Sequence, residues 1–198
     1  MPSIGLSGST RAKLSIMMFL QYAIHAVWIM QLGAYLGGSL SFTPSKIALV
    51  ANTVALGCLL APIFVGMFAD RFFASEKILV ILNLVGGALL FWASTVDSLW
   101  MLFGILLLQQ LCYMPTWAMT NSIAIANCSD TEKDLPSIRV FGSIGWVATA
   151  LFGFVSVKFL GIPWDGTNLP MVAGATSIAV QLASPWVHPA KRLQSQVT

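Results

Sequence analysis

Charged residues in this chain are confined to the gaps and ends of long apolar runs. All ten Lys and Arg and all seven Asp and Glu lie outside the centres of these runs. A charge at the middle of a bilayer costs about 2.5–3.5 kcal/mol even on permissive scales, and about 20 apolar residues suffice for a helix to cross the hydrocarbon. The pattern predicts six membrane spans, at Leu14–Leu36, Ile47–Ala69, Ile78–Thr95, Leu99–Met119, Val140–Leu160 and Leu169–Val187.

Composition excludes a water-soluble globular domain. Hydrophobic residues make up 57% of the 198 residues and charged residues 9%, whereas an ordinary soluble domain is about 25% charged. We therefore expect an all-α, polytopic membrane protein whose six-helix bundle occupies residues 14–187, with tails at 1–13 and 188–198.

The positive charges predict the orientation of this bundle. Eight of the ten Lys and Arg lie in the two tails and in the loops after the second and fourth runs, and Lys46 and Lys158 alone fall on the other side. Because cytoplasmic loops carry the excess of Lys and Arg, both tails are predicted to be cytoplasmic. The net charge of +3 then reflects membrane orientation, and no nucleic-acid partner is expected.

The runs form two triplets around a short turn at Asp97, and transporter halves are often built as three-plus-three repeats. Pro115 interrupts the fourth run, but apolar residues continue to Ala126. We predict one long helix, bent at Pro115 and ending near Asn127. The longest polar loop is expected at Ser129–Ser137, with Pro136 opening the fifth helix.

The fifth run carries a candidate binding stripe. Arg139, Ser143 and Trp146 have the spacing i, i+4, i+7 and so share one helix face. A guanidinium, a hydroxyl and an indole suit a ribose or a nucleobase, because bases stack on aromatic rings and Arg donates to their acceptor edges. Alternatively, Arg139 only marks the helix end and Trp146 meets lipid. The adjacent Gly142 and Gly145 are expected to allow close helix packing.

The first run repeats this spacing with Gln21, His25 and Trp28. Ionisable groups inside a membrane are functional candidates, and His25 is suited to substrate binding or proton relay. The alternative is a neutral histidine hydrogen-bonded between helices. Other polar residues of the runs are expected to line the same cavity or to bond across helices, namely Asn52, Asn83, Gln109, Gln110, Thr116, Trp117 and Asn121.

A charged turn follows the second run. Gly66 permits close approach, and Asp70 and Arg71 lie at the membrane surface, where a charged turn can latch onto a neighbouring helix end and bias a conformational equilibrium. This turn resembles the first half of the cytoplasmic signature of major facilitator transporters, although Phe73, Ala74 and Ser75 replace its usual glycine and basic residues. An ordinary interfacial charge pair is the alternative.

A closer resemblance, over about Leu14 to Pro189, is to the nucleoside–proton symporters of that superfamily. It rests on Phe19-Leu-Gln21, Trp28, Leu32-Gly33-Ala-Tyr35, the Gly66 turn, Tyr113-Met-Pro115-Thr116, Asn121 and, above all, Pro136-Ser-Ile-Arg139-Val-Phe-Gly142-Ser143-Ile-Gly145. The resemblance implies that Arg139, Ser143 and Trp146 help to hold a nucleoside, with Ser and Trp replacing the usual Thr and Phe. His25 departs from the pattern, because a large aromatic residue is expected there.

The resemblance covers only the amino-terminal half of a protein of about twelve spans. It implies nucleoside transport by alternating access across the cell (inner) membrane, with a proton as coupling ion and no other cofactor. The carboxylates for proton coupling belong to the second half in that family, so a second six-helix half, covalent or separate, is expected as a partner. The alternative is a non-transporting membrane subunit or a truncated fragment.

A membrane-embedded serine protease is the enzymatic alternative. Gly5-Leu-Ser7-Gly8 mimics a nucleophile motif, and His188 lies beyond the last run, but a serine nucleophile needs a base within about 3 Å and nothing in the sequence brings these two together. No catalytic residue is therefore predicted. Cys58, Cys112 and Cys128 are expected to act as small apolar residues, and no metal site is expected.

Overall fold

Helices fill the part of the chain that the computed structural model describes, which is residues 8–69, 75–128, 130–162 and 167–183. Seven helices are present in these ranges: α1 (Gly8–Gly38), α2 (Pro44–Ala51), α3 (Thr53–Ala69), α4 (Ser75–Ala93), α5 (Leu99–Asn127), α6 (Thr131–Leu160) and α7 (Leu169–Ala183). The prediction of an all-α protein is confirmed.

Four stretches of these helices are long and apolar enough to cross a membrane. Within the described residues they are Gly8–Gly38, Pro44–Ala61, Leu99–Asn127 and Thr131–Phe159, and the apolar part of α4, Leu79–Ala93, is shorter. A helix satisfies all of its backbone hydrogen bonds internally, as the hydrocarbon requires. Six membrane spans remain a prediction.

The second apolar run forms two helices that are nearly continuous. Pro44 occupies the first turn of α2, where its missing N–H costs no hydrogen bond. At the junction, the Asn52 N–H donates to the Ala48 carbonyl at 3.0 Å, and the Leu56 N–H donates to the Asn52 carbonyl at 3.0 Å. We therefore treat α2 and α3 together as one rod.

Helix α5 runs through Pro115 and ends at Asn127, as predicted. Polar side chains beyond the proline bond back to the carbonyls of the preceding turn. The Thr116 hydroxyl donates to the Tyr113 carbonyl at 2.5 Å, and the Asn121 amide donates to the Trp117 carbonyl at 2.9 Å. These bonds satisfy the polar side chains within the helix itself.

The start of α6 differs from the prediction. The helix begins at Thr131, nine residues before the predicted apolar span and five before Pro136, which was expected to open it, so most of the expected loop is helical. Asp130 caps this end by accepting a hydrogen bond from the Lys133 N–H at 3.3 Å. Glu132 and Asp134 lie in the first turn, where negative charge is favourable. The polar composition of this segment therefore reflects a capped helix start.

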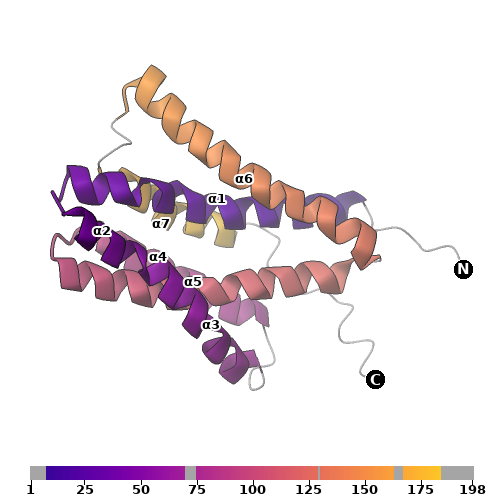
Figure 1. Cartoon of the computed structure of the whole chain (residues 1–198). Helices are drawn as coiled ribbons and strands as arrows, with labels where there is room; N and C mark the ends of the chain where they lie inside the picture. The colour runs from indigo at the N-terminus through magenta and orange to yellow at the C-terminus, as the bar shows by residue number, and fades with distance from the viewer. Residues whose placement is uncertain (1–7, 70–74, 129, 163–166, 184–198) are drawn as a thin grey trace, which may run out of the picture.

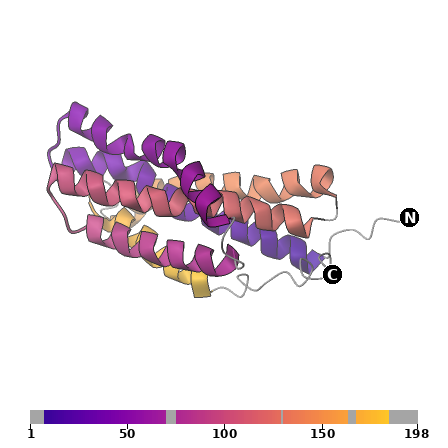
Figure 2. The same cartoon turned by 90° about the horizontal axis from the view of Figure 1, so that it is seen from below.

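The rods pack as an inverted repeat. Helix α1 lies against α6 and α7, α5 lies against α3 and α4, and α4 lies against α7 (Figures 1 and 2). If α1 is exchanged with α5, the α2–α3 rod with α6, and α4 with α7, the same set of helix pairs results. Since α5 runs opposite to α1, the two triplets are related with inverted topology, which agrees with the expected three-plus-three organisation.

Glycines make the α1–α6 seam close. A Cβ on Gly145 would lie 2.5 Å from the Phe19 carbonyl oxygen, and one on Gly142 would lie 2.9 Å from the Tyr22 ring. The predicted packing role of both glycines is confirmed. At its amino-terminal end the same seam is fastened by Arg11, which donates to the Ser137 hydroxyl at 2.6 Å. Toward its carboxyl-terminal end α6 diverges from α1 (Figure 1).

Candidate functional site

An aromatic cluster surrounds His25 where α1, α5 and α6 meet. The imidazole stacks on the Tyr113 ring, with ring centres 5.1 Å apart and planes 9° apart. The Trp117 ring meets it edge-on at 5.6 Å, and the Trp146 ring lies 5.9 Å away, tilted by 42°. Tyr22 extends the cluster by stacking on Trp117, with centres 4.6 Å apart.

The α1–α5 side of this cluster is fixed by hydrogen bonds. The Gln21 side-chain amide donates to the Thr116 hydroxyl at 2.7 Å, and the Tyr113 hydroxyl donates to the Gln21 main-chain carbonyl. All three side chains are buried. Gln21 therefore positions α5 against α1. This contact agrees with the expectation that some polar residues of these runs bond across helices.

The α6 side carries the predicted binding stripe. Each of the three stripe residues directly follows a residue that is buried in the bundle, namely Ile138, Gly142 and Gly145. Because successive residues of a helix are about 100° apart, the stripe lies beside the buried face of α6. Arg139 and Ser143 are exposed, and Trp146 is half-buried. Because Trp146 reaches His25, which faces α5, the stripe lies on the side of α6 nearer α5.

The predicted residues of α1 divide into two environments. His25 is buried, and its Nδ1 has no hydrogen-bond partner in the described part of the chain. Trp28 is 1% exposed and packs in a core with Leu32, Leu90 and Leu106, touching His25 only edge-on. The structure therefore brings His25 and Trp146 together, while Trp28 lies mainly among core residues.

Sequence reasoning did not single out Tyr22 or Tyr113 as site residues. Helical spacing could have identified them, because Tyr22 precedes His25 by three positions and Tyr113 precedes Trp117 by four, which places each pair on one helix face. Which faces of α1 and α5 meet depends on their register, which neither helix reveals by itself.

Other predicted residues are not tested by these contacts. Gly66 lies within α3, while Asp70 and Arg71 lie outside the described residues. Ser7 and His188, considered as a nucleophile and a base, also lie outside them. Among the residues that are described, no group of three or more His, Cys, Asp or Glu side chains could hold a metal ion.

Comparison with known families gives a match over most of the chain. The family model described as "Nucleoside H+ symporter" matches residues 8–191. This agrees with the resemblance inferred from the Pro136 to Gly145 segment.

Three curated relatives from Escherichia coli (strain K12) are similar to the chain. YegT, which its name assigns provisionally to nucleoside transport, is 40% identical over 86% of this chain. The xanthosine permease is 28% identical over 85% of the chain, and the nucleoside permease NupG is 28% identical over 69%. The matched regions are 40%, 40% and 34% of the relatives' own lengths, so the chain spans well under half of each relative.

Two crystal structures of the nucleoside transporter NupG share the fold. One covers 94% of this chain with a TM-score of 0.81 at 24% identity, and the D323A mutant covers 92% with a TM-score of 0.78 at 23% identity. The matches take in 45% and 47% of those chains. At this identity the likeness concerns the fold alone.

Proposed function

The chain belongs to the nucleoside–H+ symporter family, and from this membership we propose that it takes part in transmembrane nucleoside transport, proton-coupled in the complete protein. Transport would proceed by alternating access, with this six-span half rocking against a second six-helix half. Both termini would be cytoplasmic, as the distribution of Lys and Arg favours. The Gly66, Asp70, Arg71 turn would bias the equilibrium between the inward-open and outward-open states.

One observation carries the assignment of the binding site. The indole of Trp146 lies 5.9 Å from the His25 ring, in a cluster to which α1, α5 and α6 all contribute. The flat Trp146 indole, on the same helix face as an exposed guanidinium and hydroxyl, suits a nucleoside, since the base stacks while Arg139 and Ser143 bond to its polar edge or its ribose. Gln21, His25 and Trp28 would support this indole from α1.

The test is nucleoside-dependent thermal stabilisation of the purified chain in detergent, because a ligand that binds only the folded state raises the unfolding temperature. Adenosine and uridine should stabilise the native chain, and Arg139→Ala should reduce that stabilisation strongly. Lys158→Ala is the matched control, since Lys158 lies on the same helix but over the Phe154 ring, 5.3 Å from its centre. Equal responses of the two variants would reject the site.

A non-transporting membrane subunit is the second candidate. It predicts no stabilisation of the native chain by any nucleoside, with or without Arg139.

A further inference from the structure

A polar hollow lies far from the aromatic cluster, where α1 ends and α5 begins. It has a volume of about 600 Å³ and is lined by Tyr35, Ser39, Leu40, Ser94, Thr95, Asp97, Thr167 and Asn168. All of these except Leu40 carry a polar group, in a chain that is 57% hydrophobic. The volume is typical of a small-molecule site.

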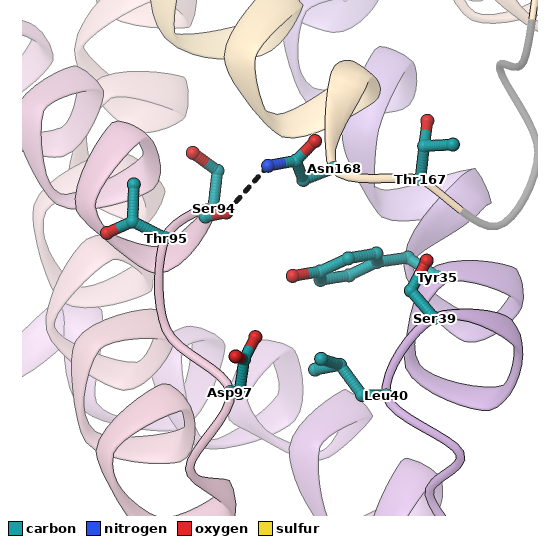
Figure 3. A pocket seen from close by; sticks show the side chains of 8 residues that line it. All are labelled: Tyr35, Ser39, Leu40, Ser94, Thr95, Asp97, Thr167 and Asn168. Atoms are coloured by element: carbon teal, nitrogen blue, oxygen red, sulfur yellow. Dashed lines mark hydrogen bonds between the residues drawn. The ribbon is translucent and has the colours of Figure 1, made fainter.

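The walls of this hollow are held in place by the fold. The Asn168 amide at the start of α7 donates to the Ser94 carbonyl at the end of α4, at 2.8 Å. Tyr35 is 5% exposed, with its ring in the core, and its hydroxyl points into the hollow toward the side occupied by Asp97 (Figure 3). The hollow is thus a junction of three segments tied together by packing and hydrogen bonding.

Asp97 supplies a negative charge that is exposed and has no ion-pair partner in the described part of the chain. At the other end of the bundle Asp130 pairs with Lys133 at 3.1 Å, and Asp134 pairs with Arg11 at 3.9 Å. Among the described residues, no cationic group lies within ion-pair distance of Asp97, and the lining of the hollow contains no basic residue. Lys46, which the charge distribution places on the same side, lies over the Phe42 ring, 5.6 Å from its centre.

The Asp97 carboxylate is the charged acceptor of the hollow and lies across it from the Tyr35 hydroxyl (Figure 3). The Ser94 hydroxyl donates to the Phe91 carbonyl at 2.6 Å, and the Thr95 hydroxyl donates to the Trp92 carbonyl at 2.8 Å. Their protons are therefore not available to a ligand. The Asp97 carboxylate can only accept a hydrogen bond, whereas the Tyr35 hydroxyl can donate and accept. A ligand that binds Asp97 must supply donors and must not be anionic.

We propose that this hollow is an outer capture site that binds the ribose of a nucleoside, with its two neighbouring hydroxyls donating to the Asp97 carboxylate. Asp97 also rejects nucleotides, because a phosphate group would lie near this carboxylate. This inference rests on the proposed function, since the hollow would supply the nucleoside to the aromatic cluster. The hollow lies at the carboxyl-terminal end of α1, ten residues beyond His25, and is tested separately.

The experiment uses alkylation of a cysteine placed in the hollow. Thr95 is exposed and lines the hollow, so Thr95→Cys is introduced with Cys58, Cys112 and Cys128 changed to Ser, and its reaction with a polar maleimide is followed in detergent. Adenosine should slow the reaction several-fold. Neither 2′,3′-dideoxyadenosine, which lacks the diol, nor adenosine monophosphate should slow it. Thr131→Cys, which is exposed at the other end of the bundle, is the control and should be unaffected.

Adding Asp97→Asn identifies the carboxylate as the binding group. Hydrogen bonds to a charged acceptor contribute strongly to affinity, so the same protection should require an adenosine concentration at least about tenfold higher than with Asp97. The monophosphate should then protect as well as adenosine does. Protection of Thr95→Cys should persist with Trp146→Ala, which separates this site from the aromatic cluster.

Three results would overturn the proposal. They are an alkylation rate that adenosine does not change, equal protection by the dideoxynucleoside, and full protection after Asp97→Asn. Stronger protection by tetramethylammonium than by adenosine would show that the hollow is a cation site and would also overturn the ribose assignment.

Discussion

The two seams that the inverted repeat makes equivalent, α1–α6 and α5–α3, share their geometry but not their chemistry. Phe19 and Gln110 each lie eleven positions after the first residue of their helix, Gly8 in α1 and Leu99 in α5. Each meets a glycine of the partner helix. A Cβ on Gly145 would lie 2.5 Å from the Phe19 carbonyl oxygen, and one on Gly57 would lie 2.6 Å from the Gln110 Cβ.

Beyond these glycines the seams differ. The α1–α6 seam leads to the aromatic cluster, through Tyr22 against Gly142 and His25 beside Trp146. On the α5–α3 seam, Gln110 is fully buried, yet neither polar atom of its amide has a partner among the described residues. The repeat therefore sets which helices come close, and the side chains decide which seam can hold a ligand.

The largest expected effect on stability comes from adding a methyl group to the glycines at the helix contacts. In Gly145→Ala the new methyl group meets a main-chain carbonyl that cannot move without shifting α1, so we expect a loss of about 3 kcal/mol in the free energy of unfolding. Nucleoside-dependent stabilisation should also fall, because Trp146 is the next residue. Thermal unfolding in detergent, with and without adenosine, measures both effects.

Gly57→Ala is the matched substitution on the other seam. It should lower the free energy of unfolding by about 2–3 kcal/mol for the same steric reason, while adenosine still raises the unfolding temperature by the native amount. A loss of the adenosine response in this variant would show that the two seams are not functionally distinct.

Replacing buried glutamines should sharpen the contrast. Gln110→Met removes an amide that has no partner among the described residues, and we expect a gain of about 1–2 kcal/mol, since an unsatisfied buried polar group costs about that much. Gln21→Met instead removes a 2.7 Å hydrogen bond to Thr116 and should cost about 1 kcal/mol. Chemical unfolding in mixed micelles gives both values, and destabilisation by Gln110→Met would indicate a partner for that amide.

The smallest effect is expected at the start of α6. The Lys133 side-chain ammonium, 3.1 Å from the Asp130 carboxylate, holds the pKa of Asp130 below its usual range. The carboxylate therefore stabilises the folded state above its ordinary pKa, and this effect is lost as the pH falls through the lowered value. Asp130→Asn should lower the unfolding temperature slightly at pH 7, and the difference should narrow toward about pH 3. A constant difference across this range would show that the carboxylate charge has no role.

Apolar runs and charge placement were sufficient to predict an all-α chain, although the second run forms two helices, and the end of α5 at Asn127 agrees with the sequence. The start of α6 was misplaced because Asp130, Glu132 and Asp134 were interpreted as loop residues, although the same residues favour a helix N-terminus. Gly142 and Gly145 were correctly predicted as packing residues.

The candidate site was only partly predictable. The spacing of Arg139, Ser143 and Trp146 placed them on one face of their helix, but the contact between His25 and Tyr113 depends on the register of α1 against α5. That register is set by tertiary contacts, such as the Gln21 to Thr116 hydrogen bond, which the periodicity of one helix does not contain.

The central claim is that a nucleoside stacks on the indole of Trp146. Its most direct test is the adenosine and uridine affinity of the purified chain after Trp146→Ala, compared with Trp92→Ala on the exposed face of α4, where the side chain is 49% exposed. Loss of one base-stacking platform costs about 1–3 kcal/mol, so we predict an affinity about 10- to 100-fold lower for Trp146→Ala and unchanged for Trp92→Ala. Equal affinities in the two variants would contradict the account.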